Sequence, residues 1–169
     1  MRSRSGGRTG SAAMAEPDPA RVVADADVLA ADLLRDGDAR DALDLVRAHS
    51  WISLVASDPL LADAHAVIAQ LADSSLADDW RERIDDLRVR VDHPPRDHPA
   101  LASAAAGDAA HLLSFDESLR TAETGVRIRE HVATSVKHPA GFCGLFDPEA
   151  LYPTIVGGDY PGPDRDPRA

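Results

Sequence analysis

The chain has 169 residues, of which 44% are hydrophobic, and it carries 18 Lys and Arg against 29 Asp and Glu, a formal net charge of −11. This length suits a single domain of ordinary size, and no stretch approaches the roughly 18 consecutive apolar residues of a membrane-spanning helix. The one cysteine, Cys143, excludes an intramolecular disulfide and a multi-cysteine zinc site, as is typical of a reducing cytoplasm. We therefore expect a cytoplasmic protein that does not enter a membrane.

The charge is carried by an unusual set of residues: 23 Asp, 6 Glu, 17 Arg and a single Lys, Lys137. Dense Asp with almost no Lys resembles the composition of proteins from extreme halophiles, whose cytoplasm is rich in salt. We expect most of these carboxylates to be solvated surface groups. They repel one another, and they repel nucleic acid, unless salt screens the charge.

The two ends differ in composition from the rest of the chain. Residues 1–13 carry three Arg and no acidic residue, and they lack the apolar segment of a signal peptide. The acidic composition begins at Met14, which makes Met14 a candidate for the natural start. Residues 157–169 are rich in Gly, Pro and charge. We expect a disordered extension over residues 1–20, one domain over 21–156 and a disordered tail over 157–169.

Within the domain, short apolar runs typical of strands alternate with longer helical patterns. Strands are predicted at residues 21–24, 51–56, 89–91, 111–113 and near 136. Helices are predicted at residues 28–34, 39–48, 58–71, 75–87, 97–107 and 117–133, with a last short helix from 147. This alternation predicts right-handed crossovers and a parallel sheet with helices on both faces.

Four acidic residues stand where the predicted fold brings segments together. Asp25 directly follows the first strand and Asp116 comes just past the fourth, and the carboxyl ends of parallel strands form the binding crevice of such a sheet. Asp97 begins the helix before the fourth strand, and Asp63 lies beside the apolar stripe of the helix after the second. Carboxylates held close together require a cation. Oxygen ligands without a Cys or His cluster favour Mg²⁺ or Mn²⁺, which supports hydrolysis of phosphodiesters.

Each of these residues also has a purely structural interpretation. Asp97 and Asp116 stand at predicted helix starts, where Asp is a common N-cap. Asp63 on its own, at its boundary position, is interpreted as a solvated residue, since the chain has 23 Asp. Asp25 is the hardest to explain structurally, because a carboxylate directly after an apolar central strand is desolvated unless it lines a site.

Four segments resemble, in order and spacing, the motifs of PIN-domain nucleases. Residues 22–29 (VVADADVL) resemble the opening strand of that family, and residues 57–63 (SDPLLAD) its second motif, a Ser followed six positions later by an acid. Residues 97–104 (DHPALASA) and 107–116 (GDAAHLLSFD) resemble the third and fourth motifs. The resemblance covers residues 21–155.

The resemblance implies a PIN-like α/β/α sandwich with a mostly parallel sheet and the activity of a metal-dependent endoribonuclease acting on RNA. It implies that Mg²⁺ or Mn²⁺ binds to four metal-ligating and catalytic carboxylates, with Ser114 orienting the site: Asp25, Asp63, Asp97 and Asp116. Homodimers are common in this family. The most familiar role of a single such domain is the toxin of a toxin–antitoxin pair, which implies an antitoxin protein as partner.

Two departures from the family leave a second interpretation open. The family usually has Glu where this chain has the shorter Asp63, and Asn or Ser where it has Asp27. The alternative is a PIN-like module with a weakened site that binds RNA or a protein partner. For RNA contact, the arginines nearest the expected cleft are Arg96 and Arg120, whereas Trp51 is interpreted as a core or partner-interface residue, as is Trp80.

Two further interpretations fit less of the sequence. Asp25 and Asp27 also resemble the first motif of haloacid-dehalogenase-like phosphatases, but that family needs a later Lys with a Gly-Asp element behind it, and nothing of that kind follows Lys137. His93 and His98 flank a Pro-rich loop and suggest a zinc site, but no Cys lies near them.

Overall fold

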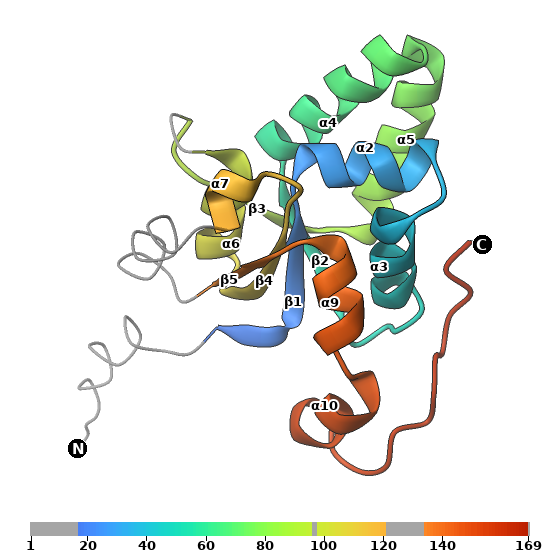
Figure 1. The fold of residues 1–169 in the computed structure, drawn as a ribbon, viewed down its shortest axis with the longest axis vertical. Coiled ribbons are helices and arrows are strands. Elements are labelled where there is room, and N and C mark those ends of the chain that lie inside the picture. The colour runs from blue at the N-terminus through green and yellow to red at the C-terminus, as the bar shows by residue number, and fades with distance from the viewer. Residues whose placement is uncertain (1–16, 96–97, 121–133, 169) are drawn as a thin grey trace.

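A five-stranded sheet organises the computed structural model, which describes residues 17–95, 98–120 and 134–168 (Figure 1). The sheet has the order β3-β2-β1-β4-β5, and every neighbouring pair is parallel. The strands are β1 (Asp18–Ala24), β2 (Ser53–Ser57), β3 (Val89–Val91), β4 (Ala109–Leu113) and β5 (Ser135–Lys137). All five predicted strands are confirmed, although their ends differ slightly from the predicted ones.

Helices cover both faces of the sheet. The connection from β1 to β2 contains α2 (Ala26–Leu34) and α3 (Asp38–Arg47), and the connection from β3 back to β4 contains α6 (Pro99–Ala106). These connections cross the sheet in opposite directions, and because such crossovers are right-handed, their helices lie on opposite faces. In Figure 1, α3 and α6 lie on opposite sides of β1. The predicted three-layer α/β/α arrangement is therefore confirmed, with an all-parallel sheet.

The remaining helices are α4 (Asp58–Leu71), α5 (Ser74–Leu87), α7 (Glu117–Arg120), α9 (Pro139–Leu145) and α10 (Pro148–Ile155). The predicted start of α4 is confirmed, because Ser57 is its N-cap and its hydroxyl accepts a hydrogen bond from the Leu60 N–H at 3.3 Å. Only the first four residues of the helix predicted over 117–133 are described, as α7. The sequence did not predict α9, which contains two glycines of low helix propensity. It is held by Phe142, which is fully buried.

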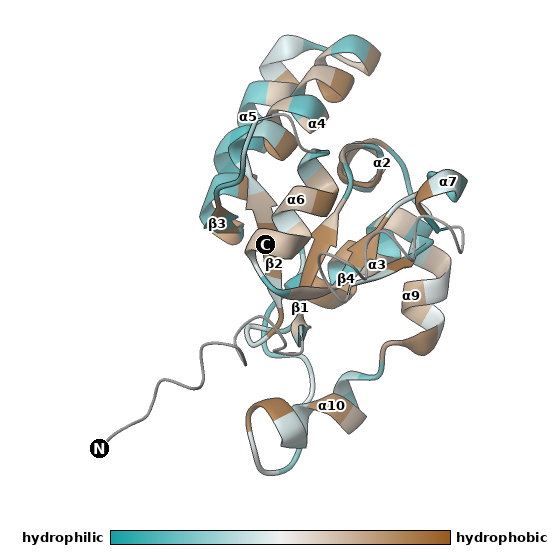
Figure 2. Cartoon of the chain, turned by 90° about the vertical axis from the view of Figure 1, so that its left-hand side faces the viewer, coloured by the Kyte–Doolittle hydropathy of each residue, from teal (hydrophilic) through white to brown (hydrophobic). Residues whose placement is uncertain are grey.

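The core lies around the central strands. Val22, Val23 and Leu112 have no exposed surface, as expected of a parallel sheet that is covered on both faces. Figure 2 shows these strands as largely hydrophobic, whereas hydrophilic and hydrophobic residues are mixed along α4 and α5. Trp80 on α5 is 6% exposed and belongs to this core. Within the described ranges, no helix is long and apolar enough to span a bilayer.

The described parts of both ends bind to the domain. The strand β1 begins at Asp18, whose N–H donates to the Asp108 carbonyl at 2.7 Å, so the ordered chain starts before residue 21. The segment 157–168, expected as a loose tail, is also bound. The Tyr160 hydroxyl lies 2.6 Å from Nε2 of the buried His49, and further along the segment two backbone N–H groups donate to a carbonyl at the end of α3. These contacts satisfy polar groups that α3 leaves open. Residues 1–16 lie outside the described part.

Removing residues 157–169 should lower the melting temperature, because the buried His49 loses one of its two hydrogen-bond partners and α3 loses the groups that cover its end. A net intramolecular hydrogen bond contributes about 1 kcal/mol, so the loss of several predicts a fall of about 5 °C or more in thermal unfolding. Deleting residues 1–13, which contain no apolar anchor, is the matched control and should leave the melting temperature unchanged. Equal melting temperatures for both truncated chains would contradict the bound tail.

Candidate acidic site at the carboxyl edge of the sheet

The strand order creates a topological switch point between β1 and β4. These strands are neighbours, but the chain leaves β1 towards β2 on one side and leaves β4 towards β5 on the other. Open parallel sheets bind their ligands outside the carboxyl ends of the strands at such a point. The ends are in register, because Ala24 pairs with Leu113 and the Asp25 N–H donates to the Leu113 carbonyl at 2.9 Å. Asp25 and Ser114, the next residues of the two strands, therefore meet at the switch point.

Asp25 is a half-buried N-cap whose carboxylate is held at both oxygens. Its Oδ1 accepts a hydrogen bond from the Ala26 N–H at 2.8 Å at the start of α2. Its Oδ2 accepts a hydrogen bond from the Ser114 hydroxyl at 3.0 Å. The carboxylate thus has a fixed orientation at the end of the central strand.

Ser114 links Asp25 to Asp116. Its side chain is buried, with 1% of the residue exposed, and the hydroxyl that donates to Asp25 also accepts a hydrogen bond from the Asp116 N–H at 3.0 Å. One hydroxyl therefore fixes both the carboxylate after β1 and the backbone of the acid after β4. This arrangement is expected of a residue that orients a site.

Asp116 is exposed, and its carboxylate is bound within its own loop. The Ser118 hydroxyl and N–H donate to Oδ1 at 2.7 and 2.9 Å. These hydrogen bonds, together with the positive charges of His98 and Arg120, hold the pKa of Asp116 below its usual value of 3.8. The carboxylate is therefore ionised at neutral pH. Arg120, expected near the cleft, lies with Nη2 3.5 Å from the Phe115 carbonyl oxygen.

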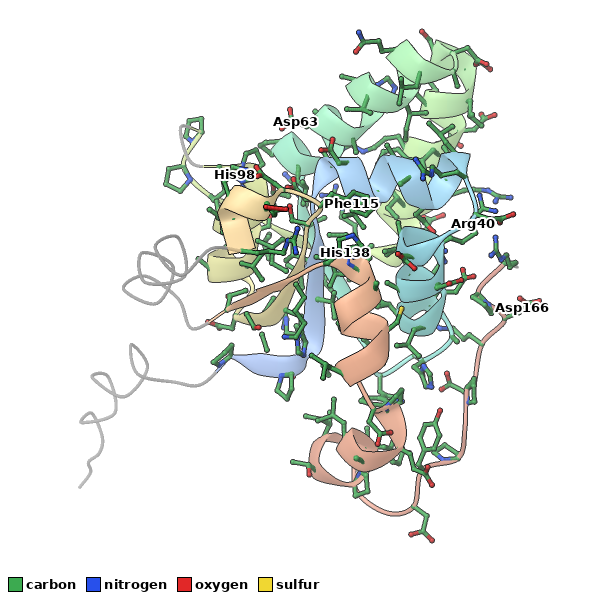
Figure 3. The ribbon with its side chains drawn as sticks, in the orientation of Figure 1. Arg40, Asp63, His98, Phe115, His138 and Asp166 are labelled. Carbon is green, nitrogen blue, oxygen red and sulfur yellow. The ribbon has the colours of Figure 1, made fainter. Side chains whose placement is uncertain are left out.

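Of the other two predicted carboxylates, only Asp63 lies within the described residues. Asp63 is exposed on α4, and Figure 3 shows it at the carboxyl edge of the sheet, above the start of α2. Asp97 lies outside the described residues, as does Arg96. Among the described residues, no three His, Cys, Asp or Glu side chains lie close enough together to hold a metal ion. Asp25, Asp63 and Asp116 alone therefore do not form a three-carboxylate cluster.

Asp25 and Asp116 nevertheless fit the chemistry of the predicted cation. Both offer carboxylate oxygens, and they are joined through the two hydrogen bonds of the buried Ser114. Mg²⁺ in proteins is commonly held by one or two carboxylates together with waters and substrate phosphates. The two carboxylates therefore offer the donor type that Mg²⁺ or Mn²⁺ prefers.

The structure gives His93 a structural role in place of the suggested zinc site. Its Nε2 lies 2.8 Å from the Ser57 hydroxyl and its Nδ1 lies 2.9 Å from the Pro94 carbonyl oxygen. Ser57 is fully buried and also accepts a hydrogen bond from the Ser103 hydroxyl at 3.0 Å. His93 therefore anchors the loop after β3 to the start of α4.

Lys137, the lysine of the phosphatase interpretation, points away from the carboxyl edge. Its Nζ donates to the hydroxyl of Ser135, at the start of β5, at 2.7 Å and lies 3.4 Å from Nδ1 of His111. Burial and the nearby Lys137 lower the pKa of His111 to about 4, so this imidazole is neutral at neutral pH. Both side chains line a mostly apolar hollow beneath α9 and α10. The arrangement gives Lys137 no contact with Asp25.

A second hollow lies at the carboxyl edge itself, and we call it the edge pocket. It has a volume of about 300 Å³ and is formed by the turn between α2 and α3 and by the ends of β4 and β5; its lining residues are Ala31, Arg35, Asp36, Gly37, Asp38, Ala39, Phe115 and His138. No local sequence pattern predicts this pocket. Its nearest signal in the sequence is Phe115, an apolar residue between Ser114 and Asp116.

Fold and site define an α/β protein with a parallel sheet and an acidic, serine-linked switch point. The model of a family of unknown function, DUF7384, matches residues 16–168, and the chain belongs to that family. No curated protein and no solved structure matches the sequence.

Replacing Ser114 by Ala should destabilise the protein by about 1–3 kcal/mol, because a buried link is lost and its polar partners are left without the hydroxyl. Urea unfolding measures this change. The control is Ser75→Ala on the exposed surface of α5, for which a change within about 0.5 kcal/mol is expected. If both variants unfold at the same urea concentration as the original chain, the hydrogen bonds of Ser114 do not stabilise the fold as described.

Proposed function

We propose that the protein is a metal-dependent endoribonuclease that holds Mg²⁺ or Mn²⁺ at the switch point. Asp25 and Asp116 are the proposed ligands, with Asp97 and Asp63 as the further carboxylates of the site. The observation that supports the proposal is the hydrogen-bonded chain from the Asp25 carboxylate through Ser114 to Asp116. It stands at the position where parallel sheets bind their ligands.

The residues of the chain have distinct proposed tasks. When bound, the ion activates a water molecule and neutralises charge on the phosphate. Asp25 presents a carboxylate that two hydrogen bonds orient. Asp116 supplies a second carboxylate that the hydrogen bonds from Ser118 keep ionised. Ser114 is a positioning residue, because it contacts both acids and fixes how they stand relative to each other.

The proposed biological role follows the resemblance rather than the geometry. As a single domain of this size, the protein is proposed to be the toxin of a toxin–antitoxin pair, with an antitoxin protein and a second copy of the chain as partners. It is proposed to act in the cytoplasm.

A second candidate function is a PIN-like module that binds RNA or a protein without cleaving it. It is favoured by the exposed Asp63, which is shorter than the Glu usual in the family, and by the missing three-ligand group among the described residues. Cleavage and binding assays separate the two functions.

The test is RNA cleavage in molar KCl, with Mn²⁺ or with EDTA. Asp25→Asn and Asp116→Asn keep the shape of the side chains but remove a negative charge. Loss of a residue that only orients a metal ligand typically costs roughly 10–100-fold. We expect Ser114→Ala to reduce Mn²⁺-dependent cleavage within that range, and each of the two Asn variants to reduce it further. Asp79→Asn, on the exposed surface of α5, is the matched control and should cleave like the original chain.

The outcomes separate the candidates. Cleavage that neither Asp25→Asn nor Asp116→Asn reduces would rule out the proposed site. RNA binding without cleavage at any Mn²⁺ concentration would favour the binding module.

A further inference from the structure

The edge pocket adjoins the switch point. Phe115 lies in the sequence between Ser114 and Asp116, and His138 follows directly after β5. The ends of β4 and β5 are joined by a hydrogen bond of 2.9 Å from the Ser114 N–H to the Lys137 carbonyl. Phe115 and His138 are therefore neighbours, and Figure 3 shows them together at the carboxyl edge.

The two rings form an aromatic surface that is open to solvent. Their centroids are 5.2 Å apart and their planes meet at 67°. Phe115 is 36% exposed, and among the large exposed hydrophobic side chains of the described residues it is the aromatic one. An exposed ring of this kind stacks with any nucleobase, because every base has a π face, and such stacking contributes about 1–3 kcal/mol per base.

The charged residues of the pocket have both signs. Arg35 is exposed and forms no ion pair within the described ranges, so its guanidinium is available for a phosphate. Asp36 is paired with Arg40 at 2.6 Å, and Asp38 begins α3. A carboxylate accepts hydrogen bonds from the N–H groups of a base but repels phosphate. The lining therefore suits a ligand with a flat ring, N–H donors and one phosphate nearby.

We propose that the edge pocket binds one nucleotide of a single-stranded RNA, with its base against Phe115 and His138 and a phosphate at Arg35. The proposal rests on the proposed nuclease function, since it names the substrate contact beside that site. The edge pocket has a volume of about 300 Å³, which lies at the lower end of the range for small-molecule sites. This size fits one nucleotide rather than a longer stretch of RNA.

The charge of the chain gives this subsite a distinctive salt dependence. RNA-binding proteins that rely on many Lys and Arg contacts lose affinity steeply as salt rises, whereas one phosphate contact on a single strand gives a slope of only about −0.7 in log K against log salt. The net charge of −11 repels RNA, and added KCl weakens that repulsion. Affinity should therefore stay nearly constant, or rise, as KCl increases.

The experiment is equilibrium binding of a fluorescently labelled single-stranded oligoribonucleotide in EDTA, where metal-dependent cleavage does not occur. Phe115→Ala should weaken binding about tenfold, and Phe115→Tyr, which keeps a ring, should bind like the original chain. His138→Asn removes the second ring and should weaken binding to a smaller extent than Phe115→Ala. Asn can still cap α9, as the His138 ring does by accepting a hydrogen bond from the Ala140 N–H, so the start of this helix is kept. Leu71→Ala removes a more exposed apolar side chain, 70% exposed, from the end of α4 and should have no effect.

Each result bears on one claim. Binding that Phe115→Ala leaves unchanged, that falls steeply with KCl, or that is absent in the original chain would overturn the subsite. Phe115-dependent binding without any Mn²⁺-dependent cleavage would overturn the nuclease and leave the subsite standing. Thermal unfolding of every variant verifies that the loss of binding is not a loss of fold.

Discussion

The hydrogen bond from the Ser114 hydroxyl to the Asp25 carboxylate joins the two central strands where their backbone pairing ends. The last paired residues of β1 and β4 are Ala24 and Leu113. Beyond them, the side chains of Asp25 and Ser114 connect the two strands at the edge of the apolar core. The same carboxylate caps α2, and the same hydroxyl holds the backbone of Asp116. This contact therefore connects the start of α2 with the loop after β4.

The partners of the acidic residues separate structural from functional candidates. Asp32 is buried and paired with Arg47 at 2.6 Å. Asp58 takes a hydrogen bond from Arg88 that, with the charges of other arginines, lowers its pKa. These carboxylates are neutralised by Arg, and they stabilise contacts between helices and strands.

Asp25 and Asp116 are held differently. Their hydrogen bonds come from hydroxyl and backbone N–H groups, and within the described ranges neither forms an ion pair with a basic side chain. Neither carboxylate is therefore neutralised by a basic side chain within ion-pair distance, although the charges of His98 and Arg120 act on Asp116 from further away. In a chain with 23 Asp, this difference in partners, rather than acidity as such, is the reason for proposing a cation site at the switch point.

Hydrophobic periodicity predicted the strands and most helices, because the buried runs around Val22, Val55 and Leu112 are determined by local sequence. It also placed Asp25 and Asp116 at strand ends. The sequence could not predict α9, since Gly141 and Gly144 disfavour a helix that is stabilised by the burial of Phe142 and by the cap of His138.

Long-range contacts account for the other differences. The bound tail depends on Tyr160 meeting His49, a residue 111 positions away. The edge pocket combines Phe115 with a turn near Arg35, and no local pattern links the two. The positions of Asp25 and Asp116 could be predicted because the carboxyl end of a parallel strand follows from the order of strands and helices along the chain. Which side chains line a pocket depends on tertiary packing, and the sequence does not show that packing.

Direct measurement of Mn²⁺ binding by titration calorimetry in molar KCl tests the central claim, that the switch-point carboxylates hold a divalent cation. The original chain and Asp79→Asn should bind Mn²⁺ equally, and Asp25→Asn and Asp116→Asn should each lose most of that affinity. Equal Mn²⁺ affinity in all four proteins, or no binding by the original chain, would contradict the account.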